Sequence, residues 1–328
     1  MTQEPMHAWM VEQYGPFQDV LQWTTVPRPT PDAGCCLIRV KAAGVNFPDI
    51  LAIAGKYQVR VPLPFTPGTE FSGEIVAVGE GSRFKPGDRV MGFQFNGAFA
   101  EYIVAPEQVL FPVPNNMPHN EAAGFLVTYQ TAHFALTRRT RLDHGEILLV
   151  HGGAGGVGTA AIQLGKSFGA TVIATAGGSK TEVCKHAGAD HVIDYKAEDL
   201  VARVREITDG HGADVILDPV GGDVFDASTR CLAWEGRLVV VGFTSGRIPD
   251  IAANRILLKN ISVIGLNWPN YQLHQPELIV EAQNQLYDLY TKGDIKPVIN
   301  RIELLENLPQ ALEAIQRRES YGKIILQG

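Results

Sequence analysis

The sequence has 328 residues, 45% of them hydrophobic, so it can bury one large core or two ordinary ones, and domains of about 150 residues favour two. A net charge of -7, with 28 basic and 35 acidic residues, argues against a nucleic acid or an anionic membrane as a partner and leaves small molecules. The four cysteines form no Cys-x-x-Cys pair or Cys/His array, which argues against a metal site and fits a reduced, cytoplasmic protein.

The first part of the chain, residues 1–122, has the pattern of a β-rich unit. Short extended runs such as Leu37–Ala43, Gly73–Val78 and Tyr102–Val104 alternate with glycine and proline turns. Residues 1–20 lack the basic start and apolar core of a secretory signal, and no stretch reaches the ~18 apolar residues of a membrane helix. We expect no membrane partner.

Residues 123–299 alternate between strands and helices, which predicts a parallel sheet with right-handed crossovers. A helical stretch from Asn120 through Leu136 comes first. The final segment, residues 300–328, contains a helix near Leu308–Arg318 and a run at Lys323–Leu326, and it could join either unit. The predicted strands are largely apolar and β-branched: Glu146–His151, Thr171–Thr175, His191–Ile193, Asp214–Leu217, Arg237–Val241 and Ile261–Gly265.

A glycine-rich loop follows the first of these strands and precedes a predicted helix. Gly153, Gly155 and Gly158 form a Gly-x-Gly-x-x-Gly pattern in the strand-to-helix context that gives this pattern its meaning. Such a loop lets the backbone approach a pyrophosphate, while the helix supplies free N–H groups. A glycine-rich turn without a ligand is the alternative. We predict cofactor contacts from Gly153, Ala154, Gly155, Gly156, Val157 and Gly158.

The end of the second predicted strand indicates which dinucleotide binds. Folds that prefer NAD usually carry an acidic residue there, whereas this chain reads Ala-Gly-Gly followed by Ser179 and Lys180. A 2′-phosphate would be attracted by Lys180 and could accept from Ser179, so the sequence favours NADPH. The alternative is that Lys180 simply lies at the solvent-exposed start of a helix and contacts no cofactor.

The sequence resembles the quinone oxidoreductase (zeta-crystallin-like) branch of the medium-chain dehydrogenase/reductase superfamily over nearly its whole length. The motifs that carry the resemblance occur in the family's order. They are Ala42–Asp49, Pro67–Gly73, Lys85–Val90, the glycine loop, Ala187–Asp190, Asp218–Gly222 and Gly322-Lys323.

The resemblance implies an α/β fold in which a Rossmann doubly wound parallel sheet, residues 123–299, is inserted in a GroES-like β-rich domain, residues 1–122 completed by about 300–328. It also implies that NADPH lies in a cleft and is bound by the loop, by Lys180 and by Tyr195, with Thr128 near the nicotinamide. Without the resemblance Tyr195 would be taken as structural, and Thr128 could bond its own helical turn.

Zinc is not expected. Similar alcohol dehydrogenases hold a catalytic zinc with a Cys and a His at positions that here carry Asn46 and Thr69, neither of which is a competent ligand. The cysteine-rich lobe that would hold a structural zinc is also missing between Val90 and Glu101. Glu70 is expected to make a buried polar contact.

Without a metal, the protein must polarise the acceptor oxygen with a hydrogen-bond donor. Asn46 and Tyr57 are the catalytic candidates; a turn-stabilising Asn and a pocket-wall Tyr are the alternatives. Gly242, Phe243 and Asn267 follow predicted strands, where ligands of parallel sheets bind, and are expected to contact cofactor.

These residues predict an NADPH:quinone oxidoreductase-like enzyme that acts on a quinone or enone. The alternatives are an enoyl-thioester or 2-alkenal reductase, and an NADPH-binding protein without catalysis that serves as a structural or sensing component. The apolar segment Lys259–Trp268 is expected to be an edge strand that joins a homodimer.

Overall fold

The structure, a computed structural model, describes residues 4–328, and residues 1–3 of the predicted first domain lie outside this range. The chain divides into two compact units. One runs up to Val127 and is completed by Ile299–Gly328, and the other is Thr128–Val298. The C-terminal segment therefore belongs with the N-terminal unit, which decides an assignment that the sequence pattern left open.

The first unit is built on a seven-stranded sheet with the order β14-β15-β3-β4-β5-β7, in which β6 also pairs with β3. The pairings are antiparallel except for β14 with β15. The strands of the sheet are β3 (Cys35–Val45), β4 (Glu70–Val78), β5 (Arg89–Phe93), β6 (Tyr102–Pro106), β7 (Leu110–Pro112), β14 (Ile299–Leu304) and β15 (Lys323–Gln327). A separate antiparallel pair is formed by β1 (Pro5–Val11) and β2 (Leu21–Pro27).

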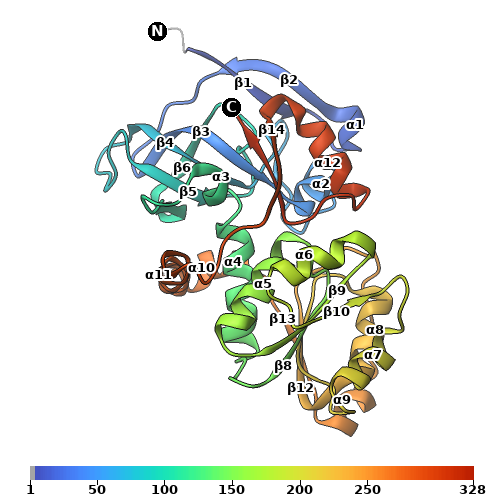
Figure 1. The fold of residues 1–328 in the computed structure, drawn as a ribbon. Coiled ribbons are helices and arrows are strands. Elements are labelled where there is room, and N and C mark those ends of the chain that lie inside the picture. The colour runs from blue at the N-terminus through green and yellow to red at the C-terminus, as the bar shows by residue number, and fades with distance from the viewer. Residues whose placement is uncertain (1–3) are drawn as a thin grey trace. The chain divides into compact units, whose positions relative to one another are not determined.

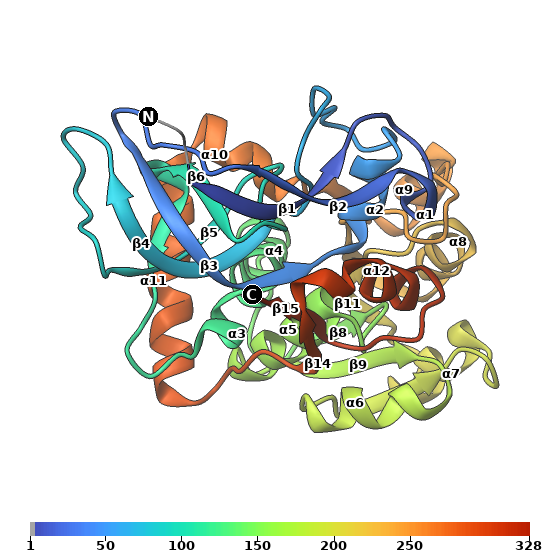
Figure 2. The ribbon, with the colours of Figure 1, turned by 90° about the horizontal axis from the view of Figure 1, so that it is seen from above.

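The last strand of the chain lies beside one of the first. β15 pairs antiparallel with β3, so that Ile324 lies opposite Val45 and Ile325 opposite Gly44. Figure 2 shows the dark red C-terminal segment against the blue strands, and α12 (Leu308–Gln316) packs on α2 (Phe47–Ile53). This pairing places Lys323 next to the start of α2. The short helices of the unit are α1 (Phe17–Val20) and α3 (His119–Ala122).

The second unit contains a six-stranded sheet with the order β10-β9-β8-β11-β12-β13, and every pair in it is parallel (Figure 1). Its strands are β8 (Ile147–Val150), β9 (Thr171–Ala176), β10 (His191–Asp194), β11 (Ala213–Asp218), β12 (Leu232–Val240) and β13 (Ser262–Gly265). Its helices are α4 (Leu126–His133), which begins at the unit boundary, α5 (Gly156–Ser167), α6 (Thr181–His186), α7 (Leu200–Ile207), α8 (Gly222–Cys231), α9 (Ala253–Lys259), α10 (Tyr271–His274) and α11 (Pro276–Lys292).

This strand order explains where a site can form. Because all six strands are parallel, their carboxyl ends lie along one edge, and the order reverses between β8 and β11. The strand interiors are apolar and buried, as a sheet covered on both faces requires. The predicted α/β fold class, with a doubly wound parallel sheet and a GroES-like β-rich part, is confirmed.

Two departures from the sequence-based prediction change the type of secondary structure. Lys259–Trp268 is not one strand, because Lys259 ends α9 and only Ser262–Gly265 is extended. Asn260, with φ 52°, adopts the left-handed conformation that ends a helix. The predicted helix through Leu136 changes to a π-helical turn over Phe134–Arg139. Among residues 4–328, every helix is too short or too polar to span a lipid bilayer.

Candidate active site

The glycine loop forms a cradle, and two of its positions have room only for glycine. A Cβ on Gly158 would lie 2.3 Å from the Gly152 carbonyl oxygen, and one on Gly153 would lie 2.9 Å from the Ala174 Cβ. Gly155 is different, because a Cβ there would meet only the Gly152 oxygen at 3.3 Å and otherwise open space. The loop therefore packs tightly against β9 and leaves the Gly155 side uncovered.

Helix α5 begins directly behind this open side. Gly155 is its N-cap, and Gly156, Val157 and Gly158 form its first turn, whose N–H groups have no acceptor within the helix. The first turn carries no acidic side chain. Ala154 is buried within the loop. Unpaired N–H groups at the positive end of a helix dipole are a binding site for an anion such as a pyrophosphate.

Several basic and hydroxyl side chains gather at the carboxyl end of β9. Ser179 and Lys180 follow this strand in a short 3-10 turn. A Cβ on Gly177 would lie 3.0 Å from the Tyr195 hydroxyl oxygen and 2.9 Å from the Lys196 Cε, so both side chains lie against the strand end. The structure thus brings Tyr195 to the turn of Ser179 and Lys180. Sequence analysis missed Lys196, which only the approach of β10 to β9 identifies.

One carboxylate also stands near this strand end. Asp194 at the end of β10 accepts hydrogen bonds from the backbone N–H of Gly178 at 3.1 Å and of Lys196 at 3.0 Å. One of its oxygens thus joins the ends of β9 and β10, and the other stabilises the turn that follows β10. No acidic residue occupies the end of β9 itself, where NAD-preferring folds hold the ribose hydroxyls.

The remaining predicted cofactor residues lie in the same unit. Gly242 and Phe243 follow β12. The Phe243 ring packs closely against Gly221, since a Cβ added to Gly221 would lie 2.9 Å from a carbon of that ring. Asn267 follows β13 and is exposed. Thr128 is buried in α4 with 3% of its surface exposed. The three residues after strands share the carboxyl edge of the sheet with the glycine loop, and the cofactor role of all four remains a prediction.

A second cluster of polar groups lies in the first unit, where α2 begins. Asp49, Thr69, Glu70 and Lys323 are all buried, and Asn46 is half-buried beside them. The Lys323 ammonium donates to Asn46 Oδ1 at 2.6 Å and to Glu70 Oε2 at 2.9 Å. We name these five residues the α2 polar cluster. Sequence analysis singled out Asn46, Thr69 and Glu70 but missed Asp49 and Lys323 as parts of it.

The Asn46 side chain is occupied at both ends. Its oxygen accepts from Lys323, and its Nδ2 lies 3.2 Å from the Gly44 carbonyl oxygen, 3.4 Å from Glu70 Oε2 and 3.5 Å from Thr69 Oγ1. Its backbone N–H donates to the Asp49 carboxylate at 2.8 Å, which stabilises the start of α2. The predicted role of Asn46 as a donor to substrate would therefore require it to exchange one of these partners.

Burial shifts the acid–base properties of two groups here. It raises the pKa of the Asp49 carboxyl to about 7, opposed by the hydrogen bond from the Asn46 N–H and by the Lys323 ammonium. Burial, followed by the nearby Asp49 charge, also raises the pKa of Tyr57. Tyr57 is thus a weaker acid than a free phenol, but it keeps its O–H as a hydrogen-bond donor at neutral pH.

The raised pKa of Asp49 predicts how stability depends on pH. The folded protein keeps a proton on Asp49 from about pH 4 to about pH 7 that the unfolded chain has released, so the free energy of unfolding should fall as the pH rises through this window. Within the window, the free energy of unfolding should fall by up to about 1.4 kcal/mol per pH unit. Asp49→Asn should remove this decline. Urea unfolding of both proteins across the window measures the difference. Parallel curves would contradict a raised pKa for Asp49.

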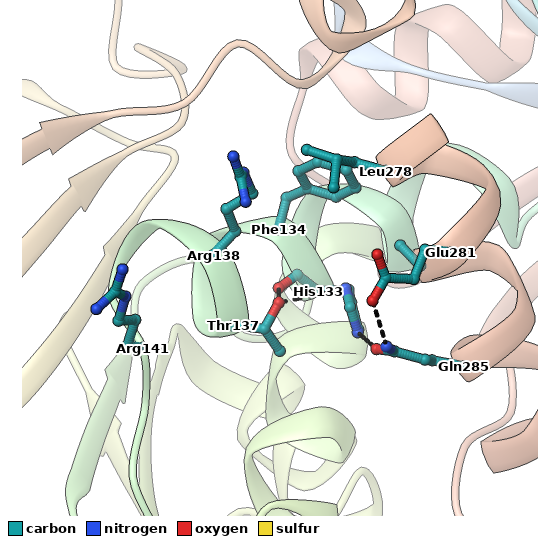
Figure 3. Close-up of a pocket in the computed structure, with 9 residues that line it drawn as sticks. His133, Phe134, Thr137, Arg138, Arg141, Leu278, Glu281 and Gln285 are labelled. Atoms are coloured by element: carbon teal, nitrogen blue, oxygen red, sulfur yellow. Dashed lines mark hydrogen bonds between the residues drawn. The ribbon is translucent and has the colours of Figure 1, made fainter. Parts of the chain in front are cut away.

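A separate pocket of about 260 Å³ lies in the second unit between the π-helical turn and α11 (Figure 3). Figure 3 shows the His133 imidazole turned toward Gln285, with Nε2 and Oε1 2.9 Å apart, whereas Arg138 and Arg141 point away from it. Burial lowers the pKa of His133. None of the predicted site residues lines this pocket, so it is not part of the candidate site.

Family models match both units. A model described as an alcohol dehydrogenase GroES-like domain matches residues 32–115, and one described as a zinc-binding dehydrogenase matches residues 156–283. The quinone oxidoreductase-like protein 2 homolog of Nematostella vectensis is 39% identical over 293 residues, which cover 88% of this chain and 80% of that protein. The chain belongs to the quinone oxidoreductase branch of the medium-chain dehydrogenase/reductase family. The resemblance inferred from its motifs is confirmed.

Solved structures of this quinone oxidoreductase family have the same fold. A mycobacterial protein complexed with NADPH is 33% identical, with a TM-score of 0.92 and coverage of 98% of this chain and 100% of its own. The Escherichia coli quinone oxidoreductase complexed with NADPH is 30% identical, with a TM-score of 0.90 and the same coverage. As a member of this family, the chain is an oxidoreductase.

The zinc named in one family description does not fit the donors of this quinone oxidoreductase family member. Asn46 and Thr69 offer an amide and a hydroxyl. The two carboxylates beside them are already engaged: Glu70 accepts from the Lys323 ammonium, and Asp49 accepts from the Asn46 backbone N–H and the Thr69 hydroxyl. Zinc sites in proteins use thiolate, imidazole and carboxylate ligands. Within residues 4–328, no group of three or more His, Cys, Asp or Glu side chains is arranged to hold a metal ion.

Proposed function

We propose that this chain is an NADPH-dependent reductase that transfers hydride, without zinc, to a quinone or another small molecule with a conjugated carbonyl. The observation that carries the proposal is the carboxyl edge of the parallel sheet. There the glycine cradle lies at the N-terminus of α5. The end of β9 is followed by the hydroxyl of Ser179 and the ammonium of Lys180, and it carries no carboxylate of its own. Two structural relatives that are complexed with NADPH support it.

Each cofactor-binding group has a physical task in this proposal. The N–H groups of the first turn of α5 hold the pyrophosphate. Ser179, Lys180 and Tyr195, with Lys196 beside them, hold the 2′-phosphate through charge-assisted hydrogen bonds. Thr128, Gly242, Phe243 and Asn267 are the proposed contacts toward the nicotinamide.

When bound, NADPH supplies a hydride from C4 of its nicotinamide. The chain's own residues orient the acceptor and stabilise the charge that develops on its oxygen. Tyr57 is the better donor for that oxygen, because the structure gives its hydroxyl no hydrogen-bond partner among residues 4–328, whereas the Asn46 amide is already engaged. With a raised pKa, Tyr57 would donate a hydrogen bond rather than release its proton.

The test of the proposed function is a panel of acceptors offered with NADPH. We expect quinones and simple enones to be reduced, followed by the loss of the cofactor's absorbance. An enoyl-thioester or 2-alkenal reductase would use the same hydride chemistry and would turn over those acceptors in preference. Binding of NADPH without turnover on any acceptor would instead support the alternative of a structural or sensing protein.

Lys180→Ala should change cofactor selectivity. Removing a charged partner of the 2′-phosphate loses about 1.5–3 kcal/mol, so the KM for NADPH should rise about 10- to 100-fold while that for NADH stays nearly constant. Lys185→Ala is the matched control, because Lys185 lies on α6 and pairs with Glu182 at 2.7 Å. Steady-state kinetics with both cofactors measures the effect. Equal changes for NADPH and NADH would contradict a 2′-phosphate contact.

The proposal includes a homodimer joined through the edge strand β13. Among residues 4–328, one side of this strand has no neighbour in the sheet, and unpaired edges tend to associate. Arg139 already donates to the Gly265 carbonyl oxygen at 3.0 Å, so part of the edge is covered. Sedimentation at micromolar concentration should give a dimer, and a monomer would refute it.

A cytoplasmic location, supported by four free thiols, completes the proposal.

A further inference from the structure

The α2 polar cluster holds a lysine in an environment that lysines rarely occupy. The Lys323 side chain is 4% exposed and that of Glu70 is 0% exposed, with 2.9 Å between Nζ and Oε2. Asn46 Oδ1 lies 2.6 Å from the same Nζ. A buried ion pair contributes little net stability compared with apolar residues of the same shape, so its presence calls for another explanation.

The surroundings leave no spare room for this ammonium. A Cβ on Gly44 would lie 3.2 Å from Lys323 Nζ, 2.9 Å from Glu70 Oε2 and 2.2 Å from the Ala123 carbonyl oxygen. The other oxygen of Glu70 accepts from the backbone N–H of Val127 at 2.9 Å. Gly44, Glu70 and Lys323 come from three paired strands, β3, β4 and β15. The ammonium is therefore fixed by the sheet.

The ammonium determines which way the Asn46 amide faces. With the amide oxygen held by Lys323, the Nδ2 group must point toward Gly44, Thr69 and Glu70. Asn46 is also the N-cap of α2, and Tyr57 follows that helix by four residues. Fixing Asn46 thus fixes the start of the element that leads to Tyr57.

We propose that Lys323 is a positioning residue for the reduction, a built-in cation that holds Asn46 and Glu70 and thereby sets α2 and the Tyr57 that follows it. This inference rests on the proposed function, in which Tyr57 contacts the acceptor. It assigns a role in turnover to the C-terminal strand, which contributes no predicted acceptor-contacting side chain.

Lys323→Met removes the charge and keeps most of the side-chain volume. We expect kcat to fall about 100-fold, the scale of a donor misplaced by about 1 Å. The KM for NADPH should change less than about 2-fold, because the phosphate cradle belongs to the other unit. Lys41→Met is the control. Lys41 on β3 pairs at 3.5 Å with Glu74 on β4, the strand that also carries Glu70, but it is partly exposed. A folded Lys323→Met protein with wild-type kcat would overturn the inference.

Chemical rescue separates the charge from the volume. Lys323→Ala leaves out the atoms of a propylammonium ion, so this ion should restore kcat in a saturable manner, whereas 1-propanol should not. If the variant is folded and no amine restores turnover, the ammonium is not what positions Tyr57. Should both single variants fail to fold, Lys323→Met combined with Glu70→Gln removes the buried charges together. Wild-type kcat in that double variant would likewise overturn the inference.

A readout that needs no turnover distinguishes this inference from the proposed function. In protein labelled with ¹⁵N at asparagine, the Asn46 side-chain amide should exchange slowly with solvent, and this protection should be lost in Lys323→Met but not in Lys41→Met. Protection that survives Lys323→Met would contradict the role of Lys323 even if the enzyme is active. A wild-type protein that reduces no acceptor would refute the proposed function while leaving this amide test valid.

Discussion

Gly155→Ala should weaken NADPH binding about 100-fold and leave the free protein nearly as stable as the wild type. The added methyl group would meet only the Gly152 oxygen at 3.3 Å, and the φ of -78° at this position suits alanine. It would, however, stand where the pyrophosphate approaches the first turn of α5. Losing one or two charge-assisted hydrogen bonds costs about 3 kcal/mol, or about 100-fold in Kd. Calorimetric titration measures the affinity.

For Gly158→Ala in the same loop we expect the main effect on the stability of the free protein. Its Cβ would lie 2.3 Å from the Gly152 carbonyl oxygen and 2.7 Å from the Gly153 Cα, which are backbone atoms that cannot move without distorting the loop. We therefore expect Gly158→Ala to lower the melting temperature, and Gly155→Ala to keep it. If Gly155→Ala binds NADPH as tightly as the wild type, the cradle does not hold the pyrophosphate.

Glu70→Gln should destabilise the first unit by about 3–5 kcal/mol, because it leaves the Lys323 ammonium buried without its counter-charge. The loss should be largest at acidic pH, where the nearby Asp49 carboxyl is protonated and cannot supply the missing charge. Because the Glu70 charge helps to raise the pKa of Asp49, the variant's Asp49 should ionise at a lower pH than in the wild type. Chemical unfolding over a range of pH measures it.

The control for this variant is Glu74→Gln on the same strand. Glu74 pairs with Lys41 at 3.5 Å and its side chain is 44% exposed, so its loss should cost less than about 1 kcal/mol. Adding Lys323→Met to Glu70→Gln should recover much of the stability, since no unpaired charge then remains buried. Equal stability of the two glutamine variants would show that the ion pair is not buried as described.

The features encoded by local patterns could be predicted from the sequence. The β-branched runs from Ile147–Val150 to Ser262–Gly265 indicate their strands, and the glycine spacing between a predicted strand and a predicted helix predicts the phosphate cradle. Strand limits were less predictable at β12, which begins at Leu232 rather than at the predicted Arg237. Glu235, with a φ of 58°, interrupts the regular pattern there.

The α2 polar cluster could not be predicted in full, because its parts are distant in the chain. Lys323 lies 277 positions after Asn46, and a lysine near a C-terminus is expected on the surface. Asp49 has no sequence signal for burial, and it becomes buried only when Thr69 and the start of α2 enclose it. Lys196 was missed for the same reason, since only the pairing of β10 with β9 brings it to Gly177.

The central claim is that the chain reduces a conjugated carbonyl with NADPH and without a metal ion. The most direct test is NADPH oxidation with a quinone by protein dialysed against a strong chelator, with the metal content measured in the same sample. We predict full turnover by protein that contains no zinc. Turnover that disappears on chelation and returns only when zinc is added would contradict the account.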